Sequence, residues 1–381
     1  MKKNRLLYPE ACKSMKQNMG KAVYDWDYLS GLSGEGPIVL FEEKLSDAVG
    51  GNYAIAMTNA TSALLTSLMV GGVGRGDEVI LPSYTWPQTL TPVILSGATP
   101  VFADIEDHSY SISVESAKKL ITKKTKAIIA VHLYGMPADV VALEKLCNDR
   151  NCLLICDAAQ GFGASQQGKS IGAYGDLVAF SFGRSKLFSV GEGGALICKT
   201  RELYEKAVAF SQHPLRVHKN VDDAELRNSV DGISMNFRMH PLIAALANGQ
   251  ITGLLQAGYL GRIRERFVEL CSALEILKRP SVLPGLPEGA SPSGVCLPLL
   301  IRGQSDLDKC REIVSGLGME TYEGGLHSAL HLSGTVQKRN FPFLQRDSDN
   351  LLFQRHATHR KGSCPNAEKR TSRTQFFVAI N

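Results

Sequence analysis

No apolar run in this 381-residue chain approaches the ~18 residues that a helix needs to cross a membrane. The chain opens with Met1-Lys2-Lys3-Asn4-Arg5, and no sustained apolar segment follows, so no signal peptide is visible. Internal repeats and low-complexity linkers are missing as well. We therefore expect a protein that is not held in a membrane.

The excess of positive over negative charge is small. The chain has 42 Lys and Arg against 37 Asp and Glu, which gives a formal net charge of +5. Proteins that bind nucleic acid usually concentrate basic residues on one face. The small excess gives no case for nucleic acid and predicts at most a modest attraction for anionic substrates.

The cysteines show no regular spacing, and their number, nine, is odd. Unpaired thiols are typical of the reducing cytosol, so we expect a cytoplasmic protein. Cys152 and Cys156, followed by Asp157, leave a metal site open as an interpretation. Their apolar surroundings favour core positions in a strand instead, and we predict no metal site.

Short apolar segments alternate with helical ones along the first two thirds of the chain, which predicts an α/β fold with a mostly parallel sheet. The predicted strands are 53–57, 78–81, 100–103, 127–131, 153–156, 177–181 and 194–198. The predicted helices between them are 41–49, 62–71, 87–96, 113–122 and 139–150.

After about residue 236 the pattern changes. Helices are predicted at 240–257, 261–277 and 306–317, with a strand at 295–301. This pattern is typical of a smaller α+β domain. The predicted division is an N-terminal arm over 1–35, a large domain over 36–240 and a small domain over 241–381.

Polar residues follow several of the predicted strands, where ligands bind in sheets of this kind. Thr58-Asn59-Ala60-Thr61 leads into a helix whose first N–H groups are suited to a phosphate, with Thr61 and Ser62 as hydroxyl donors. An ordinary helix cap is the alternative. Ser181 would donate at the same edge, and His132 is better interpreted as a satisfied loop histidine than as a base.

Lys186 follows an apolar strand and precedes Gly191-Glu192-Gly193-Gly194, a turn that lets backbone come close to a ligand. A lysine held in a partly desolvated site loses proton affinity and attacks aldehydes. The alternative is a solvated surface lysine.

Five further side chains each have a chemical and a structural interpretation. Asp157 either keeps a pyridine nitrogen protonated or caps a helix. Gln160 either bonds to a ring oxygen or lies on a helix surface, and Trp86 either stacks on a ring or packs in a core or interface. Asn236 and Arg238 precede a helix and would be caps or anion ligands.

Taken together, these segments resemble the DegT/DnrJ/StrS family of sugar aminotransferases that use pyridoxal 5′-phosphate (PLP). The resemblance runs in order from Gly34 to about Ala257. Its segments are 34–37, 59–64, 76–86, 97–105, 125–128, 131–135, 157–160, 180–194 and 236–239.

The resemblance implies the aspartate-aminotransferase (type I) fold, and it implies residue roles. Lys186 would form the imine with PLP and move protons, Asp157 would pair with the pyridine nitrogen, and Gln160 would contact the ring oxygen. Trp86 would stack on the ring. Phosphate contacts would come from Ala60, Thr61 and Ser181, and from Asn236 of a neighbouring subunit. Asn236 would then have no local partner in a monomer, and the protein would be a homodimer with shared active sites.

The implied reaction moves an amino group from glutamate or glutamine to a keto-sugar, often nucleotide-linked, or to a cyclitol ketone. Segments around Trp86 and Lys186 also resemble cyclitol and antibiotic-pathway members. A lyase resembling amino-hydroxybenzoate synthase and a PLP-binding regulator without turnover stay open. The chain departs from the family at Ala60, where most relatives have glycine, and at Gly183-Arg184-Ser185, where His-x-Thr is common. Arg184 would be an anion contact or a surface residue.

Overall fold

The computed structural model describes residues 9–24, 32–229, 233–275, 284–299, 301, 303–324, 326, 328–333, 336–337, 360–371 and 375–380. Parts of the predicted arm and small domain lie outside these residues, as do residues 276–277 of one predicted helix and residue 300 of one predicted strand. Over the described ranges, no helix is long and apolar enough to cross a membrane. The same ranges hold no cluster of His, Cys, Asp and Glu side chains suited to a metal ion.

The chain divides into two compact units that are interleaved in the sequence. Unit 1 comprises residues 1–72, 155–163 and 169–260, and unit 2 comprises residues 73–154, 164–168 and 261–381. The predicted domain boundaries at 35/36 and 240/241 stay a prediction.

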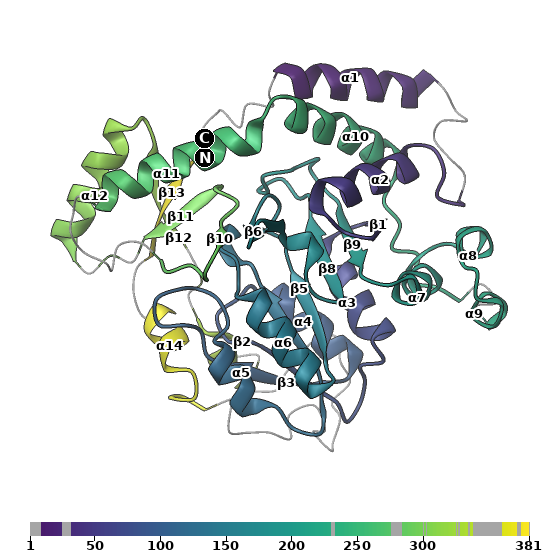
Figure 1. The fold of residues 1–381 in the computed structure, drawn as a ribbon, viewed down its shortest axis with the longest axis horizontal. Coiled ribbons are helices and arrows are strands. Elements are labelled where there is room, and N and C mark those ends of the chain that lie inside the picture. Colours follow the sequence, from purple (N-terminus) through teal and green to yellow (C-terminus); the bar gives the residue numbers. More distant parts are fainter. Residues whose placement is uncertain are drawn as a thin grey trace. The chain divides into compact units, whose positions relative to one another are not determined.

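Unit 1 is built on strands in the order β1-β9-β8-β5, of which β5 gives only its last three residues to this unit (Figure 1). Their bounds are β1 Tyr53–Met57, β9 Gly194–Cys198, β8 Leu177–Ser181 and β5 Leu153–Asp157. Strand β9 is antiparallel to both β1 and β8, whereas β5 and β8 are parallel. The ends of β1, β5 and β8 therefore meet at one edge, where β9 begins.

Helices cover these strands, and two of them pack through a glycine. The helices of unit 1 are α1 Pro9–Tyr24, α2 Pro37–Val49, α3 Ala60–Val70, α7 Arg201–Ser211, α8 Pro214–Asn220, α9 Ala224–Ser229 and α10 Pro241–Gln256, with the 3-10 turn η3 Ile171–Ala173 and the short strand β7 Lys169–Ser170. Figure 1 shows α1 lying along α10. A Cβ at Gly249 would stand 2.6 Å from the backbone nitrogen of Met15, so only glycine admits α1 at this depth.

Unit 2 contains the parallel strands of order β4-β2-β3 and a separate three-stranded sheet of order β11-β13-β12. Every residue of β2 and β3 is buried, as expected for parallel strands covered on both faces. The strands are β2 Glu78–Pro82, β3 Thr99–Ala103, β4 Thr125–Val131, β11 Cys296–Leu299, β12 Glu320–Gly324 and β13 Gln375–Ala379, with the two-residue strands β6 Ser165–Gln166 and β10 Ala290–Ser291.

The helices of unit 2 bury apolar faces against these sheets. They are α4 Pro87–Ser96, α5 Val114–Leu120, α6 Val140–Arg150, α11 Tyr259–Glu275, which starts in unit 1, α12 Gln304–Gly316 and α14 Pro365–Thr371, with the 3-10 turns η2 Leu133–Gly135 and η4 Leu330–Leu332. One core cluster joins α11 and α12 to the three-stranded sheet through buried side chains such as Leu270, Cys310 and Val378. The predicted strands and helices are confirmed, with bounds that differ by a few residues.

Candidate functional site

The first turn of α3 follows directly from β1. Asn59 caps the helix, and its side chain accepts the N–H of Ser62 at 2.8 Å. The Ser62 hydroxyl donates to the Asn59 carbonyl at 2.8 Å and lies 3.0 Å from the Thr58 hydroxyl. The helix itself has no carbonyl for the N–H groups of Ala60 and Thr61. Within this helix end, the predicted phosphate donors therefore narrow to these two N–H groups and the half-buried Thr61 hydroxyl, because the Ser62 hydroxyl is engaged.

Gly194 brings the start of β9 against this helix end. A Cβ at Gly194 would stand 2.7 Å from the backbone nitrogen of Ala60. In the sheet, Gly194 pairs with Met57 on one side and with Ser181 on the other. Gly194, the last residue of the turn predicted to let backbone approach a ligand, admits the backbone of Asn59 and Ala60. Ser181 and Ala60 thus reach the same edge of unit 1.

The segment that carries Lys186 is a closed turn between β8 and β9. Its base is held by two backbone bonds of Phe182, one from its N–H to the Gly193 carbonyl at 2.8 Å and one from the Val190 N–H to its carbonyl at 3.0 Å. Phe182 and Phe188 are fully buried, with ring centroids 4.8 Å apart. These buried rings hold the turn against the core. Within the turn, the N–H of Lys186 donates to the Gly183 carbonyl at 2.9 Å. Lys186 itself is half-buried and Arg184 is exposed. The interpretation of Lys186 as the lysine that bonds to an aldehyde stays a prediction.

Asp157 is the last residue of β5 and is 6% exposed. Its Oδ1 accepts the N–H of Ala159 at 3.1 Å, and a turn follows, closed by a bond from Gly161 N–H to the Ala158 carbonyl. No helix begins here, so the interpretations of Asp157 as a helix cap and of Gln160 as a helix-surface residue are wrong. A nearly buried carboxylate at a strand end is suited to pairing with a protonated ring nitrogen.

Asn236 lies beside β1 in the same chain. The N–H of Thr58 donates to the Phe237 carbonyl at 3.0 Å, and the backbones of Arg238 and Met57 pair in an isolated antiparallel β-bridge. Asn236 has a positive φ of 55°, and its Oδ1 accepts a bond from Arg238 Nε at 2.5 Å. The expectation that Asn236 has no local partner was therefore wrong.

The next helix, α10, does not use these residues as caps. Its cap is His240, whose Nδ1 accepts the N–H of Leu242 at 3.2 Å. The interpretation of Asn236 and Arg238 as caps of α10 was wrong, which leaves an anion ligand as the interpretation of these side chains.

Trp86 and His132 belong to unit 2 and are described within it. Trp86 is 45% exposed at the start of α4, so it is not a core residue. His132 is completely buried, and its Nδ1 accepts the N–H of Ala138 at 3.2 Å. Its Nε2 has no hydrogen-bond partner among the described residues, and burial lowers the pKa of the ring to about 3. A neutral, enclosed imidazole fits the prediction that His132 is not a base, whereas the expectation of a satisfied histidine is wrong at Nε2.

A buried ion pair, which the sequence did not predict, holds the outer edge of β1. Glu42 Oε2 lies 2.7 Å from a guanidinium nitrogen of Arg216, with side-chain exposures of 8% and 2%. The other carboxylate oxygen accepts the N–H of Ala56 at 2.6 Å. Burial raises the pKa of Glu42, against the attraction of Arg216. The pair comes from α2 and α8, and helix α8 was not predicted.

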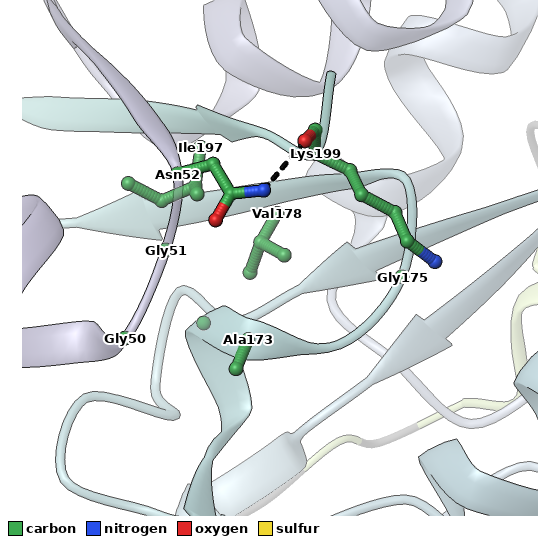
Figure 2. Close-up of a pocket in the computed structure, with 9 residues that line it drawn as sticks. Gly50, Gly51, Asn52, Ala173, Gly175, Val178, Ile197 and Lys199 are labelled. Atoms are coloured by element: carbon green, nitrogen blue, oxygen red, sulfur yellow. Dashed lines mark hydrogen bonds between the residues drawn. The ribbon is translucent and has the colours of Figure 1, made fainter.

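A small pocket in unit 1 lies at the other end of these strands. Figure 2 shows Gly50, Gly51 and Asn52 before β1 facing Ala173 and Lys199, with Asn52 Nδ2 donating to the Lys199 carbonyl at 2.7 Å. Lys199 follows the last residue of β9, whereas the edge with Ser181 and Ala60 surrounds its first residue. The pocket is therefore separate from the candidate site.

Within unit 1, one edge thus carries a helix amino end, a serine hydroxyl, a nearly buried carboxylate and a half-buried lysine. The N–H groups and hydroxyl suit a phosphate, the carboxylate suits a protonated ring nitrogen, and an amine can bond to an aldehyde carbon. These are the groups that a phosphorylated pyridine aldehyde requires, so the residues present fit PLP.

The comparisons agree with this chemistry. A sequence model of the DegT/DnrJ/EryC1/StrS aminotransferase family matches residues 28–342. The GDP-perosamine synthase of Escherichia coli O157:H7 is 36% identical over 211 residues, which cover 55% of this chain and 56% of that protein. The 3-amino-5-hydroxybenzoate synthase of Amycolatopsis mediterranei is 34% identical over 214 residues, which cover 56% of this chain and 54% of that protein.

The alignments thus span about half the length of these curated relatives. Among solved structures, DesV of S. venezuelae matches with a TM-score of 0.76 and 26% identity, covering 98% of this chain and 90% of that chain. The likeness confirms the predicted α/β fold of the aspartate-aminotransferase type.

Proposed function

Because the chain belongs to the DegT/DnrJ/EryC1/StrS aminotransferase family, we propose that it is a PLP-dependent aminotransferase. It would move an amino group from glutamate or glutamine to a keto-sugar, often nucleotide-linked, or to a cyclitol ketone. The observation that carries the proposal is the meeting of Ala60, Ser181 and the Lys186 turn around Gly194.

Bound PLP supplies an electron sink for the bonds at the amino carbon. Ala60 and Thr61 N–H groups, with the Ser181 hydroxyl, hold the phosphate at the positive end of α3. Asp157 keeps the proton on the ring nitrogen, because a nearly buried carboxylate stabilises a cation beside it. Gln160 would orient the ring through its oxygen, and Trp86 would stack on the ring, as the resemblance implies.

Lys186 has two roles in this proposal. Its Nζ would hold the cofactor covalently, and as a free amine it would carry a proton away from and back to the substrate carbon. The closed turn over Phe182 and Phe188 supports both roles, because it fixes the backbone that carries Lys186.

A homodimer with shared sites is part of the proposal. Asn236 is exposed beside Thr58, so it is available to the phosphate of a neighbouring subunit once its bond with Arg238 is exchanged. A cytoplasmic location fits the nine cysteines, which are all present as thiols. Aminosugar, aminocyclitol or antibiotic biosynthesis is the corresponding setting.

The test is spectroscopic and chemical. Purified protein should show a visible cofactor band, borohydride should fix the cofactor on Lys186, and glutamate or glutamine should bleach the band. Lys186→Ala should lose the fixation, whereas Lys199→Ala, a control at the far end of β9, should keep it. Cofactor fixed equally in Lys186→Ala would contradict the assignment.

The similarity to 3-amino-5-hydroxybenzoate synthase supports a second candidate, a PLP lyase. The same lysine and aspartate would then serve dehydration and aromatisation of a cyclic keto acid that already carries an amino group. Formation of an aromatic amine, with no bleaching by either amino donor alone, would favour the lyase over the aminotransferase.

A further inference from the structure

Ser83, His331 and Glu368 form a hydrogen-bonded chain inside unit 2. The Ser83 hydroxyl bonds to His331 Nδ1, and His331 Nε2 lies 3.0 Å from Glu368 Oε1. The three residues come from the end of β2, from η4 and from α14. The chain therefore ties together segments that are up to about 285 residues apart in sequence.

The proton positions in this chain follow from the burial of its members. Burial lowers the pKa of His331, although the bond to Glu368 opposes this shift. Burial raises the pKa of Glu368, but bonds from His331 and from the Gly362 N–H outweigh it and leave the pKa below its usual value. Glu368 is thus a carboxylate that accepts His331 Nε2–H, and Nδ1 is left to accept the Ser83 hydroxyl proton.

Backbone hydrogen bonds hold both ends of this hydrogen-bonded chain in place. The carboxylate of Asp104, just after β3, accepts the N–H groups of Asn366 at 3.0 Å and Ala367 at 2.9 Å, which fixes α14 and with it Glu368. At the other end, the Ser83 N–H donates to the Ala103 carbonyl at 2.9 Å, and the Ser83 carbonyl accepts from Leu330 N–H at 2.8 Å. Ser83 is therefore held at its N–H, its carbonyl and its hydroxyl.

The order Ser-His-Glu matches that of serine hydrolases, yet the burial argues against a nucleophile. Ser83 and His331 are both 0% exposed, so a substrate carbonyl has no access to the Ser83 oxygen. A chain of this kind orients groups rather than attacking a substrate.

The loop beyond Ser83 shows what is oriented. Tyr84 and Thr85 are buried, and the Tyr84 hydroxyl lies 3.1 Å from that of Tyr134. The next residue, Trp86, is 45% exposed. The exposed Trp86 thus directly follows three buried residues, of which Ser83 is the first.

We propose that the Ser83–His331–Glu368 chain is a positioning device that fixes the direction of Trp86 and thereby raises affinity for the pyridine cofactor. The last part rests on the proposed function, in which Trp86 covers the cofactor ring. The three residues act through Trp86 and do not touch the reacting atoms.

The test uses Trp86 as its own reporter. The protein has two tryptophans, Trp26 and Trp86. A Trp26→Phe background therefore leaves Trp86 as the only source of tryptophan fluorescence. In that background, Ser83→Ala should increase acrylamide quenching of Trp86 in the cofactor-free protein and raise the PLP dissociation constant about three- to tenfold, as expected for one lost buried hydrogen bond. Ser67→Ala is the matched control, because Ser67 is also 0% exposed and its hydroxyl donates within α3, to the Ala63 carbonyl.

Two further variants keep the test decisive if Ser83→Ala folds poorly. Glu368→Ala should reproduce the quenching change, whereas Glu368→Gln, which keeps an acceptor for His331, should restore most of the wild-type signal. The double variant Ser83→Ala/Glu368→Ala should be no worse than either single one. The proposal would be overturned if acrylamide quenching of Trp86 changed no more in Ser83→Ala and Glu368→Ala than in Ser67→Ala. Labelling of Ser83 by a fluorophosphonate would also overturn it. If wild-type protein binds no PLP, the proposed function fails, and the quenching data still decide whether the chain positions Trp86.

Discussion

Gly194 stands so close to Ala60 that a Cβ on the glycine would lie 2.7 Å from the Ala60 nitrogen. This contact places an N–H of the α3 amino end beside Ser181, the cross-strand partner of Gly194. The contact leaves no room for any side chain at 194.

Gly194→Ala should therefore displace the first turn of α3. We expect a loss of about 1–3 kcal/mol in the free energy of unfolding, typical of overpacking, and at least about a tenfold rise in the PLP dissociation constant. Denaturant titration and absorbance titration measure the two effects. Gly20→Ala is the control, since its Cβ would meet nothing within 4 Å in α1, and it should not weaken either quantity. Unchanged cofactor affinity in Gly194→Ala would separate this contact from the phosphate site.

Glu42→Ala should destabilise unit 1 strongly, because it leaves the Arg216 guanidinium buried without its carboxylate. Breaking a buried pair from one side typically costs about 3–5 kcal/mol. The neighbouring Glu43→Ala, at an exposed position, should change the free energy of unfolding by less than about 0.5 kcal/mol. Equal losses in the two variants would show that the ion pair does not hold β1.

His132 should make the protein less stable in acid. Burial lowers its pKa from 6.5 to about 3, so between these values the unfolded chain binds a proton that the folded chain does not. The contribution is therefore fully present above pH 6.5 and is lost as the pH falls towards 3. At pH 5 the loss from this group alone is about 2 kcal/mol.

Urea unfolding at pH 7 and pH 5 measures that loss. His132→Asn keeps an acceptor for the Ala138 N–H but cannot be protonated, so its stability should fall by about 2 kcal/mol less than that of wild type over this range. His108→Asn, at a side chain that is 86% exposed, should follow wild type. A variant at 132 that tracks wild type would refute the expectation.

Subunit mixing tests whether Asn236 acts in its own chain or across a dimer. If it acts across, a hybrid of Lys186→Ala and Asn236→Ala subunits has one site with both defects and one intact site. Random mixing should then restore about a quarter of wild-type activity. If Asn236 acts within its own chain, both sites of the hybrid are defective and no activity returns.

The strands around the site could be predicted from sequence because each is a short apolar run that ends at a polar residue, as β8 does at Ser181. The antiparallel direction of β9 was missed, although its signal was present. The link from β8 to β9 holds about a dozen residues and no helical pattern, whereas a parallel connection needs a crossover of at least that length, usually a helix. The two-residue strands β6, β7 and β10 carry no periodicity that a sequence could reveal.

The partnerships that support the site were beyond sequence reasoning. Glu42 and Arg216 are about 170 residues apart in sequence, and Ser83 and His331 about 250, so no local spacing predicts either pair. Asn59, by contrast, sits where a cap is expected, between β1 and an apolar helix, and a capping argument could have identified it.

The interleaving of the two units has a consequence for synthesis on the ribosome. Strand β1 pairs with β9, which leaves the ribosome about 140 residues later. Until then the nascent β1, four of whose five residues become buried, waits without its partner while strands of unit 2 emerge. Neither unit can therefore be completed from one continuous stretch of chain, and we expect folding to be slow and to depend on protection of the emerging strands.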